Sequence, residues 1–203
     1  METLAHQEDG RGVPRHPVVC VLNMLGLSLA LQYLTTSLTT IILAGAFALQ
    51  YGASLALHWF PHSNVRQTID HLAIAILISA TYTQFVVCLP APGIEWRVAV
   101  LLSSAVAVCL VRLAFPNREG LRAIMYLGSG LWGFAVSLQS LWCLPAAALV
   151  LFLAGTGLYL LQLMIFIKQK PNWAPELIGF RGVQHIIVLA GSATHLYTAS
   201  VYL

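Results

Sequence analysis

Four ionisable side chains fall within or at the edges of long apolar segments, and together they suggest metal chemistry. They are His58, Asp70, Arg181 and His185. Ionisable groups in such segments are costly to bury and are functional hypotheses by default. Arg181 and His185 are four residues apart, as are Ser54 and His58, so each pair lies on one face of a helix. Imidazoles and a carboxylate from three segments predict a divalent-metal site, with zinc favoured by the nitrogen ligands.

The same four residues have a second interpretation, which needs no metal. All of them lie near the ends of their segments and would share one layer, where side chains reach interfacial water and pair with one another. Depth and spacing do not separate the two interpretations, so both stay open. His195 lies ten residues beyond His185, roughly 15 Å deeper at 1.5 Å per residue. It is expected to form a hydrogen bond between helices rather than to bind the same ion.

The segments that position these residues are typical of membrane helices. The chain is 59% hydrophobic and only 8% charged, whereas soluble domains carry roughly 25% charged residues. A spanning helix needs about 20 mostly apolar residues. Such runs occur at 17–33, 39–60, 68–89, 96–115, 121–141, 145–167 and 180–202. We therefore predict an all-α fold, a bundle of seven transmembrane helices forming one integral membrane domain over 1–203, with residues 1–16 as a tail.

The distribution of basic residues predicts the orientation of this bundle, because cytoplasmic loops are enriched in Lys and Arg. With seven spans, nine of the ten Lys and Arg residues fall on one side and only Arg97 on the other. The amino terminus is then cytoplasmic and the carboxyl terminus outside. Six helices, one of them long and tilted, is the alternative count, because the first two runs are separated only weakly by Thr35, Thr36, Ser37 and Thr39.

The composition also limits the partners of the chain. Its formal net charge is +3, which is too small to imply nucleic acid, and none is expected as a partner. The loops are roughly 4 to 12 residues long, too short for an extramembrane domain. A membrane lipid is the expected partner, acting inside the bundle or at its rims. A homo-oligomer stays open.

Three stretches resemble signatures of the hemolysin III and progestin/adipoQ receptor superfamily. Ser54-Leu55-Ala56-Leu57-His58 matches an S-x-x-x-H element. The stretch at 69–74, followed by 79–83, resembles a third-helix signature, and 185–192 with His195 is similar to the ending of the last helix. The matches run in the family's order over roughly 51–203. The resemblance implies seven helices, a cytoplasmic amino terminus and a zinc ion held by three histidines, with an aspartate behind a bound water.

Carried over residue by residue, this resemblance implies His58 and His185 as metal ligands. It makes Asp70 the partner of the bound water, and Ser54 is the other candidate catalytic position. The remaining ligand position falls on Arg181, where the family has histidine. Arginine cannot ligate zinc, because it stays protonated and offers no lone pair.

Two hypotheses follow for this replaced ligand position. In the first, the guanidinium of Arg181 stands in for the metal and pairs with Asp70, which offsets the cost of burying either charge alone. In the second, zinc remains, Arg181 turns toward the headgroups, and His62 or His71 completes the ligand shell.

The resemblance leaves three functions to weigh, and whether the chain is an enzyme stays open. The favoured one is a hemolysin III-like membrane protein in membrane-lipid or membrane-energetic homeostasis, with a degenerate metal site on the cytoplasmic side. The alternative is a zinc-dependent intramembrane hydrolase of amide-linked lipids, similar to a ceramidase. A pore-forming hemolysin is the weakest, because nothing resembles a lined pore. Arg181 favours the first, and the resemblance suggests a bacterial inner membrane.

Overall fold

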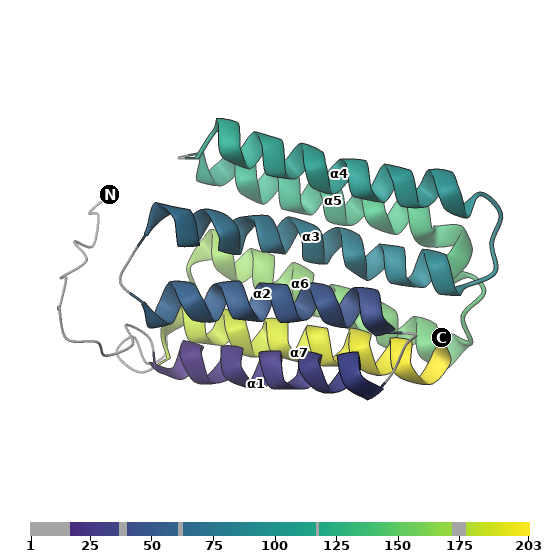
Figure 1. Ribbon diagram of the computed structural model, residues 1–203, viewed down its shortest axis with the longest axis horizontal. Helices are drawn as coiled ribbons and strands as arrows, with labels where there is room; N and C mark the ends of the chain where they lie inside the picture. Colours follow the sequence, from purple (N-terminus) through teal and green to yellow (C-terminus); the bar gives the residue numbers. More distant parts are fainter. Residues whose placement is uncertain (1–16, 37–39, 61–62, 117, 172–177) are drawn as a thin grey trace.

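The computed structural model describes residues 17–36, 40–60, 63–116, 118–171 and 178–203, and these form α-helices with no strand among them. The predicted tail at 1–16 and His62 lie outside the described residues. The helices lie lengthwise alongside one another (Figure 1). Their bounds are α1 Pro17–Thr36, α2 Ile41–Trp59, α3 Asn64–Cys88, α4 Ile94–Ala114, α5 Glu119–Leu141, α6 Ala146–Lys168 and α7 Gly179–Tyr202.

Six of these helices, α1 to α6, are long and apolar enough to cross a membrane. The prediction of an all-helical bundle is thereby confirmed, and so are six of its membrane-spanning segments. Helix α7 has 24 residues but is not among these six. Several of its polar side chains are nevertheless buried against neighbouring helices: Gln184, Ser192, His195 and Thr198. Helix α7 therefore depends on its neighbours to satisfy or enclose these groups.

The helix boundaries follow from local backbone chemistry. The segment Pro90-Ala91-Pro92-Gly93 separates α3 from α4, and Gly93 has φ +73°, a left-handed conformation that glycine adopts without a steric penalty. Helix α3 begins at Asn64, four residues before the start predicted from hydrophobicity. The polar residues Arg66 and Gln67 are good helix formers, so the helix extends beyond its apolar run. Asp70 consequently lies in the second turn of α3 rather than the first.

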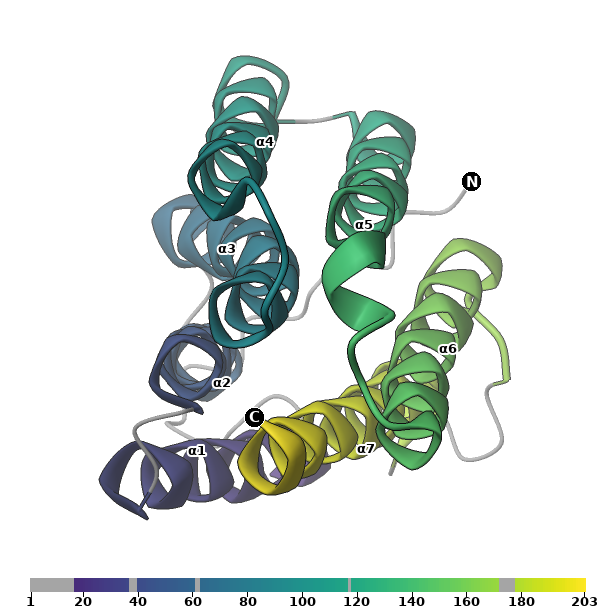
Figure 2. The same cartoon turned by 90° about the vertical axis from the view of Figure 1, so that its right-hand side faces the viewer.

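Helix α7 packs between α1 and α6, and α3 contacts α2, α4 and α5. The end-on view shows this arrangement, with α5 and α6 next to one another on one side of the bundle (Figure 2). Side chains of Phe47, Phe85, Phe152, Leu101 and Leu196 are fully buried between the helices. These residues come from α2, α3, α4, α6 and α7, and Ala30 of α1 and Leu141 of α5 complete the core.

Two polar contacts join neighbouring helices within this apolar core. The Oε1 atom of Gln84 on α3 accepts a hydrogen bond of 3.2 Å from the backbone N–H of Leu43 on α2. The buried guanidinium of Arg97 on α4 donates to Ser140 over 3.1 Å and also to Gln139, both on α5. Such contacts satisfy polar groups that lipid cannot.

His195 does not play the part predicted for it. Its side chain is fully buried, and both ring nitrogens lack a hydrogen-bond partner. The ring instead packs against aromatic neighbours, with its centroid 5.1 Å from that of Phe152 and 5.3 Å from that of Tyr159. The prediction of an interhelical hydrogen bond was wrong, because the side chains that face α7 at this depth are rings rather than acceptors.

A Gly155→Ala substitution on α6 is expected to destabilise the bundle. A Cβ atom at this position would lie 2.8 Å from Nε2 of His195, and the surrounding rings leave that side chain little room to move. Overpacking of this kind costs about 1–3 kcal/mol of the free energy of unfolding, more than the gain of about 1 kcal/mol in helix propensity. Thermal unfolding in detergent measures the change.

Gly157→Ala is the matched control for this substitution, because a Cβ atom at Gly157 meets nothing within 4 Å. It lies on the same helix and gains the same helix propensity, so its unfolding temperature should equal or exceed that of the wild type. Equal unfolding temperatures for the two variants would contradict the packing described for His195.

Candidate functional site

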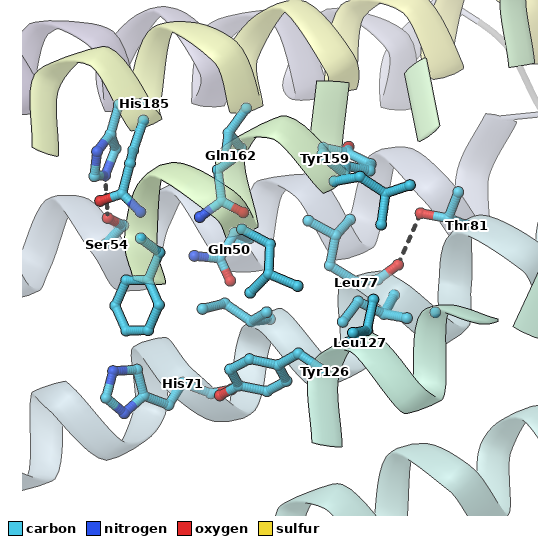
Figure 3. Close-up of a pocket in the computed structure, with 18 of the residues that line it drawn as sticks. Gln50, Ser54, His71, Leu77, Thr81, Tyr126, Leu127, Tyr159, Gln162 and His185 are labelled. Atoms are coloured by element: carbon cyan, nitrogen blue, oxygen red, sulfur yellow. Dashed lines mark hydrogen bonds between the residues drawn. The ribbon is translucent and has the colours of Figure 1, made fainter. Parts of the chain in front are cut away.

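A cavity of about 600 Å³ lies inside the bundle. It is lined by residues from all the described helices except α4, and its walls are mostly apolar. Polar side chains gather toward one end, where Ser54 and His185 meet; Gln50 and Gln162 face one another further in, and Tyr159 and Thr81 lie beyond them (Figure 3). The predicted site residues Ser54, His58, Asp70, Arg181 and His185 all line this cavity. The structure therefore brings together what the sequence placed on three segments.

Ser54 is the centre of a hydrogen-bonded network at the polar end. Its Oγ atom accepts a bond of 3.1 Å from Nδ2 of Asn23 on α1 and lies 3.3 Å from Nε2 of His185 on α7. The Nδ1 atom of His185 lies 2.8 Å from the backbone oxygen of Arg181. These bonds are mutually consistent when Nδ1 carries the imidazole proton, because Nε2 then accepts from the serine hydroxyl. Three helices are linked in this way.

Asp70 is buried beside this network. Its Oδ1 atom accepts a hydrogen bond of 3.2 Å from Nε2 of Gln50, and Ser54 is also a close neighbour. Gln50 and Ser54 are four residues apart on α2, so they present both polar groups to the same side. The carboxylate is thus held by α2 although it belongs to α3.

The two histidines predicted as metal ligands are also adjacent. The ring centroids of His58 and His185 are 5.5 Å apart, and the rings meet edge to face at 84°. His58 is buried, whereas His185 is partly exposed toward the cavity. The prediction that α2 and α7 bring an imidazole each to the same end of the bundle therefore agrees with the geometry.

Arg181 does not form the ion pair hypothesised for it. Its side chain is exposed, and its guanidinium carbon lies 6.0 Å from the centroid of the Phe180 ring. Its charge acts on Asp70 through space, but among the described residues no ion pair joins the two, and the carboxylate bonds to Gln50 instead. A long flexible side chain at a helix end reaches the interface more easily than it can be held in the bundle.

His71 was one of the two residues considered as a third ligand, and it points elsewhere. Its Nδ1 atom lies 3.0 Å from Nε of Arg112 and 2.8 Å from Nη1 of Arg122. These arginines belong to α4 and α5, so His71 is engaged by them, although its side chain lines the same cavity as His58 and His185. Of the two candidates, only His62 lies outside the described residues.

Asn23 and Gln50 are parts of the site that the sequence analysis did not single out. Gln50, Ser54 and His58 recur every four residues on α2, and this polar stripe was a signal for Gln50. Asn23 lies within the apolar run of α1, where a polar residue needs a partner. Only the packing of α1 on α2 identifies that partner as Ser54.

Comparison with known protein families adds an independent finding. A family model described as haemolysin-III related matches residues 13–196. The chain belongs to the haemolysin-III-related family. The match includes every predicted site residue, and with six apolar helices it makes this an integral, multi-pass membrane protein. The resemblance found in the sequence is confirmed, whereas the loss of a metal ligand at Arg181 is not addressed by the family match.

The described residues of this haemolysin-III-related protein do not fit a zinc site with three protein ligands. Catalytic zinc takes three protein ligands from nitrogen, sulfur or carboxylate donors. No group of three or more His, Cys, Asp or Glu side chains is arranged to hold a metal within the described ranges. The third family position carries the cationic Arg181, and Nε2 of His185 is engaged by Ser54. The polar side chains of the described site form hydrogen bonds with one another instead.

Proposed function

We propose that this haemolysin-III-related protein binds a membrane amphiphile in its cavity and acts in membrane-lipid or membrane-energetic homeostasis. The single observation that supports this most is the cavity itself, a volume of about 600 Å³ with polar groups at one end and apolar walls beyond. This volume lies within the range of roughly 300–1,000 Å³ that small-molecule sites occupy. A polar head and one hydrocarbon chain match its two parts.

The polar end offers specific partners to the head of such a molecule. Ser54, Gln50 and the edge of His185 supply donors and acceptors, and Asn23 and Asp70 hold them in place. These bonds hold the side chains in place, so the site is preorganised and needs little rearrangement on binding. Among the described residues Oδ1 of Asn23 and Oε1 of Gln50 have no hydrogen-bond donor, so both are left to accept from a head group. A neutral or zwitterionic head with hydroxyl or amide groups fits this arrangement.

The side walls support entry from the bilayer. Several cavity-lining leucines on α5 and α6 are also exposed to the surroundings of the bundle. Leu131 is 57% exposed, Leu153 45% and Leu160 43%. In a membrane these side chains face acyl chains, so a lipid reaches the cavity sideways without passing through water.

The experiment that tests this function is direct. Protein purified in a mild detergent should carry a co-purifying amphiphile, near one molecule per chain, that solvent extraction and mass spectrometry identify. A labelled single-chain amphiphile should then bind saturably to the stripped protein. Absence of both a retained lipid and saturable binding would overturn the proposal.

The zinc-dependent amide hydrolase is the alternative, and the nearness of His58, His185 and Asp70 at one end of the cavity favours it. It requires a third ligand from outside the described residues. A pore is less compatible with the fold, because fully buried rings of Phe85, Phe152 and His195 fill the bundle beyond the cavity.

We also propose that α7 crosses the membrane, so that the amino terminus is cytoplasmic and the carboxyl terminus outside, in a bacterial inner membrane. The charge distribution supports this orientation. At the end of the bundle where α3, α5 and α7 begin lie the described basic residues Arg66, Arg112, Arg118, Arg122, Lys168, Lys170 and Arg181, and at the other end only Arg97. Basic residues gather on the cytoplasmic side of membrane proteins.

Reporter fusions in a bacterial host test this orientation. Alkaline phosphatase fused after Leu203 is expected to be active, because it folds only outside the cytoplasm, and green fluorescent protein at the same place should be dark. A fusion after Lys170 is the control and should show the reverse. A fluorescent fusion at Leu203 would place both ends of α7 on one side and refute its spanning.

A further inference from the structure

Two buried arginines converge on one histidine at the end of the bundle where α4 ends and α5 begins. Nε of Arg112 donates to Nδ1 of His71 over 3.0 Å. Nη1 of Arg122 lies 2.8 Å from the same Nδ1 atom and 3.3 Å from Nε2. Arg112 is 4% exposed and Arg122 7%. We call these three residues the Arg–His–Arg cluster.

The second contact of Arg112 is also with a neutral group. Its Nη1 atom donates to the backbone oxygen of Pro116 over 3.2 Å. Within the described residues, this guanidinium bonds to the imidazole and to this carbonyl, and to no carboxylate. A buried cation is normally paired with an anion. Arg112 therefore carries a positive charge that its neutral partners solvate but do not neutralise.

The two guanidinium groups also repel each other. The charge of Arg122 acts on Arg112, and both charges act on His71. A neutral imidazole has one acceptor nitrogen, yet both arginines approach it. Each guanidinium has five N–H donors in a flat fork, which matches the oxygens of a phosphate. An oxyanion placed against the cluster would accept from N–H groups of Arg112 that the imidazole and the carbonyl do not use, and it would offset the repulsion.

The surrounding backbone favours the same kind of ligand. Arg122 lies in the first turn of α5, whose N-terminus carries a partial positive charge. The hydroxyl of Tyr126, one turn further, donates to the backbone oxygen of His71 over 3.0 Å and so ties α5 to α3. Arg112 lies in the last turn of α4. Both arginines of the cluster thus lie at helix ends, near the headgroup layer, and His71 lies about two turns into α3.

We propose that the Arg–His–Arg cluster binds a phosphate group, carried either by an anionic phospholipid of the adjacent leaflet or by free phosphate. The phosphate oxygens accept from the guanidinium forks of Arg112 and Arg122, and His71 holds the two side chains in register. Basic pockets between helices on the cytoplasmic side of membrane proteins bind anionic headgroups in this manner. His71 and Arg122 also line the cavity, whereas Arg112 does not. The phosphate is proposed on the side where Arg112 lies, so this proposal does not depend on the amphiphile.

The test compares lipid binding to delipidated, full-length protein by native mass spectrometry. The wild type is expected to bind phosphatidylglycerol at least about tenfold more tightly than phosphatidylcholine, because the choline group of the latter brings a further positive charge to the two arginines; tenfold corresponds to about 1.4 kcal/mol. Arg112→Gln should abolish this preference. Arg118→Gln is the control, since it removes an exposed charge at the same end of the bundle without touching the cluster. It should keep the preference.

Inorganic phosphate distinguishes the two sources. If the free ion is the ligand, millimolar phosphate should raise the unfolding temperature of the wild type in phosphatidylcholine alone, and not that of Arg112→Gln. Arg112→Lys is the substitute variant if Arg112→Gln does not fold. A single ammonium lacks the flat fork of N–H donors, so most of the preference for phosphatidylglycerol should be lost. The proposal is overturned if neither phosphatidylglycerol nor phosphate is preferred, if Arg118→Gln loses as much as Arg112→Gln, or if Arg112→Lys binds like the wild type.

Discussion

A Gly130→Phe substitution is expected to abolish amphiphile binding while the bundle stays folded. Gly130 lines the cavity, and a Cβ atom built on it meets nothing within 4 Å. On α5 it lies one turn from Tyr126, which also lines the cavity, and three residues from Gly133, where a Cβ would meet the Tyr82 ring of α3 at 2.3 Å. Its side of the helix therefore faces inward, and a phenyl ring would occupy the space of the ligand.

The effect should be large, because the ring and the hydrocarbon chain cannot share one volume. Losing about 3 kcal/mol of binding free energy weakens affinity roughly a hundredfold. Binding of a labelled single-chain amphiphile measures this, together with the lipid retained on purification. The unfolding temperature should not fall, since phenylalanine replaces glycine in a helix interior and gains about 0.5 kcal/mol of helix propensity.

Gly128→Phe is the matched control for this variant. It lies on the same helix two residues away, so it faces the opposite side, and its Cβ position is equally open. It is exposed and does not line the cavity. The control should bind like the wild type. Equal binding by both variants would mean that the amphiphile lies elsewhere on the protein.

Arg181→His is expected to create a zinc site in a protein that otherwise binds little zinc. Residues 181 and 185 share one face of α7, and the ring of His185 already lies 5.5 Å from that of His58. A third imidazole supplies the missing ligand, and three protein nitrogens are enough for zinc. Metal analysis of purified protein should give about one zinc per chain for the variant and well below one for the wild type.

Arg181→Gln separates ligation from charge in this experiment. It removes the positive charge beside the site but adds no ligand that zinc prefers. If repulsion alone excludes the ion, this variant should bind zinc as well as Arg181→His does. If the third ligand matters, only the histidine variant should bind. A second control, His58→Ala in the Arg181→His background, should lose the ion again.

The zinc content of the wild type, measured in the same way, distinguishes amphiphile binding from zinc-dependent hydrolysis. About one zinc per chain in the unmodified protein would mean that a group outside the described residues, such as His62, completes the shell. The hydrolase would then become the better-supported function. No zinc in any variant would mean that His58 and His185 are held for hydrogen bonding alone, through Ser54 and its neighbours.

The layer that holds the candidate site was predictable from the sequence because it depends on local rules. Apolar runs predict helices long enough to span, and the spacing of four residues places Ser54 with His58, and Arg181 with His185. The alternation of chain direction then puts the end of α2 and the starts of α3 and α7 at the same level. The predicted helix ends differ from the observed ones by a few residues, since polar residues such as Arg66 extend a helix beyond its apolar part.

The partners of these residues were not predictable in the same way, because they depend on how each helix is rotated against the next. Asp70 and His71 are adjacent in sequence, yet Asp70 bonds to Gln50 on α2 and His71 meets arginines of α4 and α5. A step of one residue turns the side chain by about 100° on a helix of 3.6 residues per turn. Interhelical packing alone determines which neighbour each of them faces.

The sequence by itself therefore determined the helical bundle, its family and the chemical identity of the groups at one end. These predictions rest on hydrophobic periodicity, the spacing of polar residues and the excess of basic residues. Such properties are local or additive, so they can be read from the sequence alone. The tertiary structure decided that Asn23 supports Ser54, that Arg181 is exposed rather than paired with Asp70, and that two arginines share His71. Each of these depends on contacts between distant segments, which form only when side chains of different volumes are packed together.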